Sequence, residues 1–175
     1  MTNIKNVTVL GTGVLGSQIA FQTATSGFAV TAYDINGDAI AAAKERFAEL
    51  AKTYEAEVET AAGRTTEILA SITFSSDLAA AVADADLIIE AVPEVLELKQ
   101  DIYGNLAEAA PAKTIFATNS STLLPSDLKD ATGRPDRFLA VHFANQIWKF
   151  NTAEVMRTAD TDPEVFDTVV DFSAA

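Results

Sequence analysis

The sequence predicts an α/β fold, a doubly wound and mostly parallel sheet with helices on both faces. Two observations carry this prediction. Short apolar runs alternate with longer segments of helical periodicity along the chain, which is typical of βαβ units. The 175 residues are 49% hydrophobic and 21% charged, the composition of a folded domain that can bury one good core. We therefore expect residues 1–175 to form one domain.

Six apolar runs predict the strands of the sheet. The first precedes a glycine cluster, the second ends in an aspartate, and the third, ADLIIEAV, is expected to be a buried strand. The carboxyl ends of parallel strands deliver their following residues to one crevice, so polar residues there are of interest. The predicted strands cover residues 6–11, 29–34, 85–92, 113–119, 137–144 and 152–158.

Helices are predicted in the intervals between these strands. Gly27 ends the first helix, Pro111 stops the helix after the third strand, and Asp162 caps the last one. The last helix runs into the final residues with no stop signal, which we expect either of a chain cut short or of a frayed natural end. The predicted helices cover residues 14–26, 38–54, 94–109 and 125–129, with a less regular helical stretch over 55–69 and a last helix from 163 onward.

Composition and charge narrow the possible partners. A net charge of −13, with a pI near 4.3, opposes binding to nucleic acid or to an anionic membrane. The chain has no cysteine and one histidine, so disulfides and thiolate chemistry are excluded and we expect no metal. The N-terminus lacks the apolar core of a signal peptide, and no apolar run reaches ~18 residues. We expect a cytoplasmic protein that binds a small molecule through local features.

A glycine cluster follows the first predicted strand and opens the first predicted helix. Gly11, Gly13 and Gly16 form G-x-G-x-x-G, whose glycines permit a tight turn, close approach of a pyrophosphate and close helix packing. Asp34 ends the second strand, where a carboxylate can accept both ribose hydroxyls, and Ile35 rather than an arginine follows it. The pattern predicts a Rossmann-type site for NAD rather than NADP. The alternative is a tight turn and an aspartate that merely begins a loop.

A second set of candidate residues lies late in the chain. His142, the only histidine, lies in an apolar strand, Ser121 follows the preceding strand, and Glu154 comes twelve residues after the histidine. A carboxylate at that point could fix the tautomer of the imidazole and raise its basicity. Taken singly, each residue also has a structural explanation: a satisfied core histidine, a turn hydroxyl and a solvated strand position. Together they predict an acid–base site at the strand ends.

The chain resembles the N-terminal NAD-binding domain of the L-3-hydroxyacyl-CoA dehydrogenases over essentially all of its length. The motifs that carry the resemblance are GTGVLGSQIA, AYD, IIEAVPE followed by LKQDIY, FATNSSTL, FLAVHFAN and AEVM, in the family's order. The resemblance implies that His142 is the catalytic base, that Glu154 is its paired carboxylate, and that Ser121 holds the substrate oxygen. It assigns cofactor binding to Gly11, Gly13, Val14, Leu15, Gly16, Asp34, Val92, Glu94, Lys99 and Asn119, and substrate binding to Ser121 and Asn145.

The resemblance also implies a reaction and a domain organisation. In the family, the base takes the proton of the C3 hydroxyl of a 3-hydroxyacyl-CoA while hydride passes to NAD, a step of fatty-acid β-oxidation. Family members continue into an all-α C-terminal domain that forms dimer contacts, closes the cleft and adds a catalytic asparagine. We therefore expect a homodimer for the full-length protein, and poor turnover by residues 1–175 alone.

Two features depart from the family pattern. His142-Phe143-Ala144-Asn145-Gln146 stands where the family usually has His-Phe-Phe-Asn-Pro. Residues 36–70 contain seven acidic and four basic side chains, so no net positive field awaits the phosphates of coenzyme A. Two alternatives therefore stay open. One is a dehydrogenase of a free 3-hydroxy acid, such as a sugar acid, and the other is a non-catalytic NAD-binding module that has no need of His142.

Overall fold

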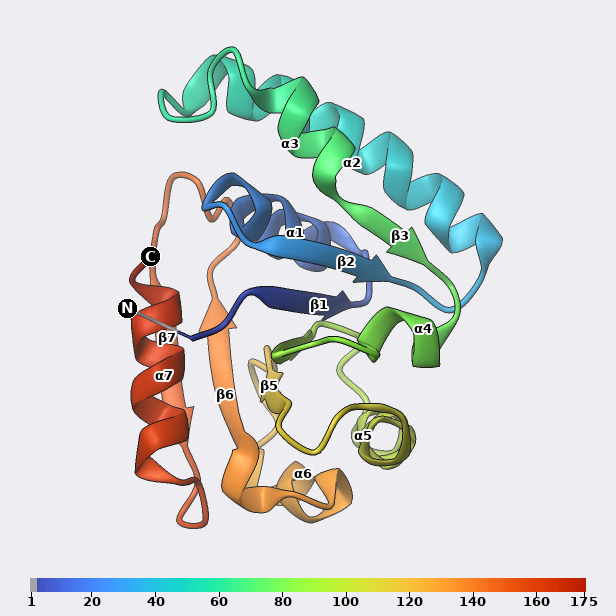
Figure 1. Cartoon of the computed structure of the whole chain (residues 1–175), viewed down its shortest axis with the longest axis vertical. Helices are drawn as coiled ribbons and strands as arrows, with labels where there is room; N and C mark the ends of the chain where they lie inside the picture. Colours follow the sequence, from blue (N-terminus) through green and yellow to red (C-terminus); the bar gives the residue numbers. More distant parts are fainter. Residues whose placement is uncertain (1–2) are drawn as a thin grey trace.

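Seven strands form one sheet in the computed structural model, which describes residues 3–175 (Figure 1). Their order is β3-β2-β1-β4-β5-β6-β7, and every neighbouring pair is parallel except β6 with β7. The chain moves outward from β1 in both directions, so the strand order reverses between β1 and β4, where doubly wound sheets bind ligands. The strands are β1 (Asn6–Leu10), β2 (Ala29–Tyr33), β3 (Thr73–Ser75), β4 (Leu87–Glu90), β5 (Ile115–Thr118), β6 (Phe138–Phe143) and β7 (Ala153–Arg157).

Helices cover both faces of this sheet (Figure 1). Four of them pack on one face: α1 (Val14–Thr25), α2 (Gly37–Glu57), α3 (Thr65–Ser71) and α7 (Pro163–Ser173). The other face carries α4 (Leu78–Val82), α5 (Leu96–Ala109) and α6 (Pro125–Leu128), with short 3₁₀ turns at Lys129–Thr132 and Pro135–Arg137. No helix within residues 3–175 is long and apolar enough to cross a membrane.

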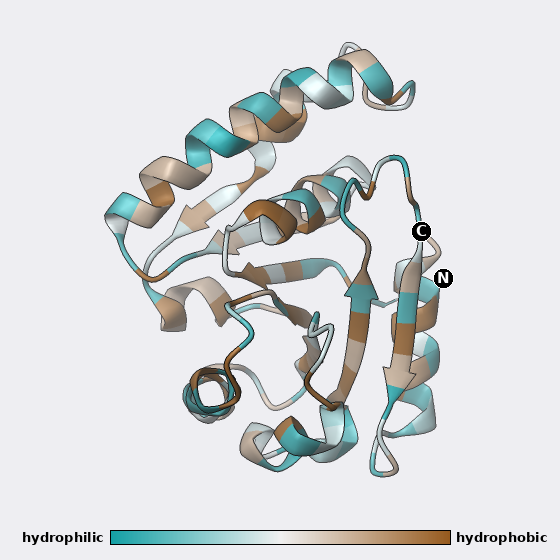
Figure 2. Cartoon of the chain, turned by 180° about the vertical axis from the view of Figure 1, so that it is seen from behind, coloured by the Kyte–Doolittle hydropathy of each residue, from teal (hydrophilic) through white to brown (hydrophobic). Residues whose placement is uncertain are grey.

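The core is divided by the sheet into two apolar layers. Alternate residues of a strand point to opposite faces, so Val9 of β1 packs in the first layer and Leu10 in the second. Figure 2 shows the apolar colours concentrated in the strands, with polar positions along the outer side of α2. Each fully buried aliphatic or aromatic side chain contributes about 1.5–3 kcal/mol relative to exposure, which makes these layers the main stabilising feature.

The predicted α/β class and all six predicted strands are confirmed, whereas β3, α4 and the two 3₁₀ turns were missed. Strand β3 is three residues long and α4 only five, too short to show a periodic pattern. The predicted start of the helix at Glu94 was wrong, because α5 begins at Leu96 with Val95 as its N-cap. Glu94 lies before the helix, and its carboxylate binds the loop after β5 instead.

The turn between β1 and α1 is too close for any side chain at two of its glycines. Gly11 has φ +87°, and its amide donates to the carbonyl of Tyr33. A Cβ on Gly16 would stand 1.9 Å from the carbonyl oxygen of Gly11, which is backbone that cannot rotate away. Gly13 differs, since a Cβ there would meet nothing within 4 Å. The three glycines of the motif therefore serve two different purposes.

We predict that Gly16→Ala destabilises the fold while Gly13→Ala, its matched control, hardly does. Relieving the contact at Gly16 requires α1 to move from β1, at a cost of about 1–3 kcal/mol or more. At Gly13, the N-cap of α1, the substitution costs less than about 1 kcal/mol. Urea unfolding followed by circular dichroism measures both values. Equal losses in the two variants would contradict this reading of the turn.

Candidate active site

The candidate residues gather where the strands end, at the edge of the sheet. The glycine loop follows β1, Asp34 follows β2, the segment from Ala91 to Glu94 follows β4, and residues 119–123 follow β5. His142 lies near the end of β6, which is parallel to these strands. The topology thus brings together residues that are up to 131 positions apart, counted from Gly11 to His142.

The glycine loop presents the N-terminus of α1 to this edge. Gly13 caps the helix without a side chain, so no side-chain oxygen occupies the first amides. These amides and the helix dipole favour an anion, and the open space at Gly13 leaves room for its approach. The local field at this point opposes the net charge of −13, which would otherwise repel a phosphate.

Asp34 is held in place by the loop that it faces. Its Oδ2 accepts from the amide and the hydroxyl of Thr12, at 2.8 and 2.5 Å, and its Oδ1 accepts from the amide of Ile35 at 2.8 Å. Burial raises the pKa of Asp34, but the Thr12 and Ile35 hydrogen bonds and the nearby charge of Arg46 outweigh it and leave the pKa below its ordinary value. The carboxylate is ionised and oriented, as an acceptor for ribose hydroxyls must be.

Two hollows meet at the glycine loop and share Gly13, Ala91 and Val92 in their walls. The larger one, of about 670 Å³, has a mostly apolar wall and reaches Asp34. The smaller one, of about 350 Å³, reaches Asn119 and Ser121. The pair therefore forms one elongated site that runs from Asp34 past the glycine loop to Ser121. The smaller hollow is lined by Gly13, Val14, Leu15, Gly16, Ala91, Val92, Glu94, Lys99, Asn119 and Ser121.

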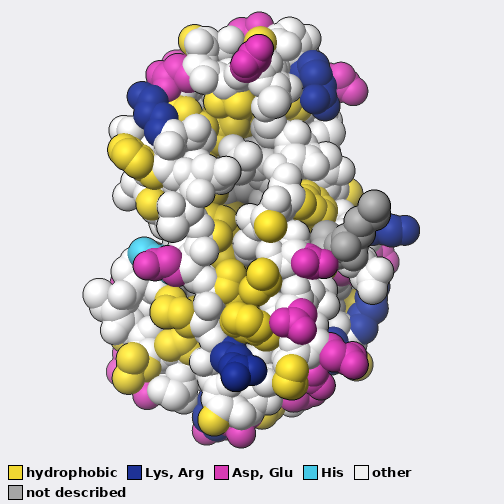
Figure 3. All heavy atoms as spheres, turned by 90° about the vertical axis from the view of Figure 1, so that its left-hand side faces the viewer, with side chains coloured by type: hydrophobic (Ala, Val, Ile, Leu, Met, Phe, Trp, Pro, Cys, Tyr) yellow, Lys and Arg dark blue, Asp and Glu magenta, His cyan; other side chains and the backbone are white. Residues whose placement is uncertain are grey.

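His142 stands between a carboxylate and a hydroxyl. The antiparallel register of β6 and β7 pairs it directly with Glu154, and its Nδ1 lies 2.8 Å from Glu154 Oε2. Its Nε2 lies 3.0 Å from Ser121 Oγ. A carboxylate accepts hydrogen bonds, so the contact with Glu154 favours the tautomer that carries its proton on Nδ1 and leaves Nε2 as the acceptor facing Ser121 Oγ. Figure 3 shows the histidine at the molecular surface, beside an acidic side chain.

The two asparagines that the sequence indicated have different surroundings. Asn119 is buried, and its Oδ1 accepts from the amide of Phe143 at 2.9 Å, which ties the end of β5 to the end of β6. Asn145 is exposed on the loop after β6. Asn119 therefore has a structural contact beside the cofactor role predicted for it, and the predicted roles of both residues stay predictions.

Glu94 binds the loop that carries Ser121. Its Oε1 accepts from the amides of Ser121, Thr122 and Leu123, at 3.1, 2.9 and 3.3 Å, and from the hydroxyls of Ser120 and Thr122. Partial burial would raise the pKa of Glu94, but the hydrogen bonds of Ser120 and Thr122 and the ammonium of Lys99 hold it far below its ordinary value. Lys99 lies 3.0 Å from Oε2 of the same carboxylate.

Sequence reasoning did not predict a role for the buried Glu90, which lies behind the contact between Lys99 and Glu94. Glu90 is fully buried and pairs with Lys99 at 2.8 Å, and its Oε2 accepts from the hydroxyls of Thr118 and Tyr103. Burial, followed by the charge of Glu90, raises the pKa of Tyr103, so its phenol stays protonated and can donate. The one available signal was a glutamate at the end of an apolar strand, nine residues before a lysine.

The loop after β6 is fastened to α2. Trp148 Nε1 donates to Glu57 Oε2 at 2.9 Å, Lys149 pairs with the same oxygen at 3.0 Å, and the Trp148 ring lies 5.6 Å from that of Tyr54. Gln146 has φ +59°, and its amide donates to Gln18 of α1. This loop, which departs from the usual family sequence, thus has a defined position against α1 and α2. Among residues 3–175 no group of His, Asp and Glu could hold a metal ion.

Comparisons with known proteins show the family of the chain. Residues 6–175 match a family model described as 3-hydroxyacyl-CoA dehydrogenase, NAD binding domain. The human mitochondrial hydroxyacyl-coenzyme A dehydrogenase is 36% identical over 98% of this chain, and a probable 3-hydroxybutyryl-CoA dehydrogenase of Bacillus subtilis is 34% identical over 92%. The chain spans 56% of the length of each.

Solved structures give the same fold and one much nearer sequence. A diketoreductase, from a study of dual catalysis of dicarbonyl compounds, matches with TM-score 0.98 and 68% identity over 99% of this chain and 62% of its own. The 3-hydroxybutyryl-CoA dehydrogenase of Escherichia coli matches with TM-score 0.91 and 28% identity over 98% of this chain and 36% of its own.

We predict that Glu94→Gln flattens the acid side of the stability profile. A carboxylate whose folded pKa is depressed stabilises the fold above its unfolded pKa, and this contribution is lost as pH falls through the folded value. The parent should therefore lose unfolding free energy on acidification below about pH 4.5, the ordinary value of this carboxyl. The variant should lose less of it, and start lower at pH 7.

Urea unfolding at several pH values between neutrality and the acid limit measures this difference. The control is Glu97→Gln, which removes an exposed carboxylate from the first turn of α5. A Glu94→Gln profile parallel to that of the parent would show that the loop contacts do not hold the ionised form.

Proposed function

The chain belongs to the 3-hydroxyacyl-CoA dehydrogenase family as an NAD-binding domain, and we propose that it supplies the cofactor site, the base and the substrate-holding serine of a reversible alcohol dehydrogenase. The observation that carries the proposal is the continuous line from Ser121 Oγ to His142 to Glu154, with contacts of 3.0 and 2.8 Å. It lies next to the hollow that begins at the glycine loop, since Ser121 belongs to the wall of that hollow.

In the direction of oxidation, His142 Nε2 accepts the proton of the substrate hydroxyl, and Ser121 Oγ holds the oxygen from which it comes. The imidazolium that forms is stabilised by Glu154, whose charge faces Nδ1. In reduction the same imidazolium returns the proton to the carbonyl oxygen. Glu154 is largely exposed, so its main effect is to fix the ring and its tautomer rather than to supply a strong ion pair.

The residues present fit NAD. Gly11, Gly13 and Gly16 leave the backbone free to approach a pyrophosphate, and Asp34 would accept the ribose hydroxyls. Val92, Glu94, Lys99 and Asn119 would line the nicotinamide half, with Val14 and Leu15 at its edge. The bound nucleotide supplies the acceptor or donor of hydride, while the protein supplies orientation and proton transfer.

The first candidate substrate is a 3-hydroxyacyl-CoA, because that is the substrate named for most of the relatives. The phosphates of coenzyme A would need cations, and the four cations of residues 36–70 already have contacts within the chain. Lys44 lies over the ring of Phe74, Arg46 donates to the carbonyl of Thr12, Lys52 pairs with Glu49, and Arg64 approaches the carbonyl of Thr60.

The second candidate is a free dicarbonyl compound, favoured by the 68% identity with a diketoreductase. Both candidates share one reacting unit, since a 3-oxoacyl thioester is itself a ketone two carbons from a second carbonyl. They differ in whether the binding energy comes from the nucleotide part of coenzyme A. A free 3-hydroxy acid, such as a sugar acid, is the third candidate substrate, and its oxidation belongs to the same reaction class.

The remaining proposals follow from the first one. A place in fatty-acid β-oxidation applies if the thioester is the substrate.

A homodimer is proposed for the full-length protein, with residues 1–175 as its NAD-binding domain and an all-α domain supplying the dimer contacts. The cytoplasm is the proposed compartment, although several relatives carry the word mitochondrial in their names. A small molecule is the proposed partner, and nucleic acid and membranes are not.

We predict that His142→Gln removes turnover and leaves NADH binding intact. Loss of a positioned general base costs about 10²–10⁴ in rate, while the glycine loop and Asp34 are untouched. NADH affinity is measured by fluorescence, and turnover by NADH oxidation, on this chain and on a version extended by the all-α domain that the family carries. Full turnover in His142→Gln would favour a non-catalytic role for this residue, or a different base.

We predict that the extended chain oxidises NADH when acetoacetyl-CoA is the substrate. The same assay is run separately with a free 1,3-diketone, and the KM values of the two compounds are compared. If the thioester is reduced with a KM far below that of the free diketone, the coenzyme A part contributes to binding and the first candidate holds. If the diketone is reduced as well or better, the second candidate holds. NADH binding with no oxidation of either compound by the extended chain would contradict both.

A further inference from the structure

A buried ion pair lies behind the loop that carries Ser121, and none of the proposed proton transfers uses it. Glu90 at the end of β4 is 0% exposed, and Lys99 of α5 is 1% exposed. A buried pair of this kind brings little net stability, because the cost of removing both charges from water offsets their attraction. Its presence at the edge of the site is therefore not explained by stability alone.

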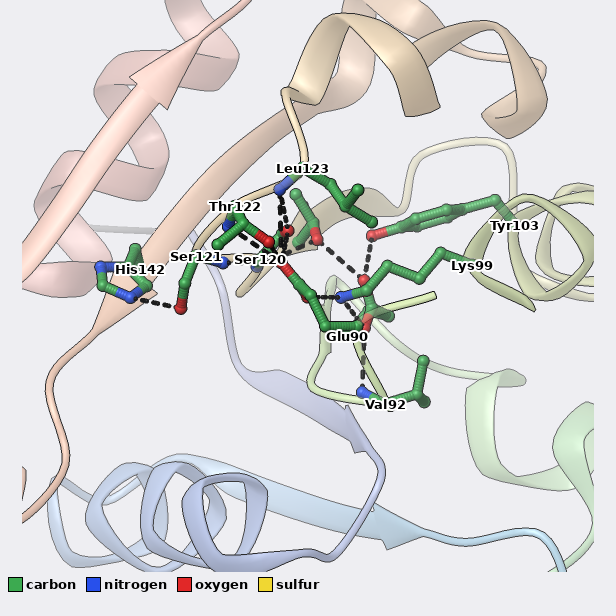
Figure 4. Close-up of polar contacts among 11 residues, drawn as sticks. Glu90, Val92, Lys99, Tyr103, Ser120, Ser121, Thr122, Leu123 and His142 are labelled. Atoms are coloured by element: carbon green, nitrogen blue, oxygen red, sulfur yellow. Dashed lines mark hydrogen bonds and ion pairs between the residues drawn. The ribbon is translucent and has the colours of Figure 1, made fainter. Parts of the chain in front are cut away.

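We propose that Glu90 is a positioning residue, which holds residues 119–123 so that Ser121 Oγ lies at Nε2 of His142. The importance of that contact rests on the proposed function, but the positioning itself is a property of this chain. Figure 4 shows Glu90, Lys99, Ser121 and His142 within one set of connected polar contacts, in which Glu94 joins Lys99 to the backbone amide of Ser121.

The first connection runs through charge. Oε1 of Glu90 lies 2.8 Å from Lys99 Nζ, and the same ammonium lies 3.0 Å from Oε2 of Glu94. Lys99 thereby takes one oxygen of Glu94 and turns the other, Oε1, toward the loop. That second oxygen accepts the three successive amides of residues 121–123.

The second connection runs through a hydroxyl. Oε2 of Glu90 accepts from Thr118 Oγ1 at 2.8 Å, and Thr118 Oγ1 accepts from the amide of Ser120 at 3.2 Å. The backbone carbonyl of Glu90 also accepts from the amide of Asn119 at 2.8 Å. The two oxygens of one carboxylate therefore reach the loop on both sides of Ser121.

The outer part of the loop depends on these contacts because it is open to solvent. Asn119 and Ser120 are buried, whereas Ser121 and Thr122 are exposed, so hydrogen bonds hold the backbone of these two residues. A 2.8 Å link at each oxygen of Glu90 converts the rigid position of β4 into a defined position for Ser121. Without the charge of Glu90, Lys99 has only Glu94 to bind and is free to draw that carboxylate away from the amides.

The test reads the ring of the one histidine in the chain, whose nitrogen resonances are therefore unambiguous in ¹⁵N NMR. Ser121→Ala provides the reference spectrum of a ring without the hydroxyl at Nε2. Glu90→Gln keeps the shape of the side chain and removes its charge. The matched control is Tyr103→Phe, which removes the 3.4 Å donor to Oε2 of the same carboxylate, together with the contact of the phenol with Thr118, and leaves the charge of Glu90 in place. All spectra are recorded on this chain without cofactor.

The expected result is that Glu90→Gln moves the Nε2 resonance toward its position in Ser121→Ala, while Tyr103→Phe leaves it in place. Thr118→Val keeps the shape of the side chain and breaks the connection from Glu90 Oε2 to the amide of Ser120, so it should move the resonance in the same direction and serves as the test if Glu90→Gln does not fold. An Nε2 resonance that coincides with the parent's, or an equal shift in Tyr103→Phe, overturns the proposal. Since turnover plays no part, failure of the proposed reaction would show separately.

Discussion

The contact between Gly11 and Gly16 is the constraint on which the rest of the structure depends. Because a Cβ at Gly16 would stand 1.9 Å from the Gly11 carbonyl, only this pair lets α1 begin directly against the end of β1. That approach puts the helix N-terminus at the edge of the sheet, next to Ala91 after β4. This approach also shapes the two hollows, which meet at the glycine loop. It places Thr12 of the same loop against the carboxylate of Asp34.

Charge is organised locally in this protein, against a strongly negative total. The proposed anion site would rely on backbone amides and a helix dipole, whereas the carboxylates around the proposed site are held by fixed hydrogen-bond donors. Glu94 is surrounded by donors and Asp34 by Thr12 and Ile35, so each keeps its charge and its orientation. Within residues 3–175 no buried side-chain nitrogen or oxygen lacks a hydrogen-bond partner, so the site is as fully satisfied as the core.

Sequence reasoning predicted the sheet and which residues gather at its edge, and what it missed has a physical reason. The glycines and Asp34 are local signals, since their spacing alone places them on a strand end and a helix start. The contact of His142 with Glu154 depends on the antiparallel register of β6 and β7, which spacing suggested but could not establish. Glu90 was missed because burial hides its partners: Lys99 and Tyr103 come from α5 and Thr118 comes from β5.

The fastening of the loop after β6 to α2 has an optical consequence. Trp148 is the only tryptophan of the chain, and its indole N–H is bonded to Glu57 while its ring lies beside Tyr54. Its emission therefore reports a single place, the junction between that loop and the far end of α2. A ligand that displaces the loop changes the polarity around the indole, and the protein carries an intrinsic fluorophore for following that movement in real time.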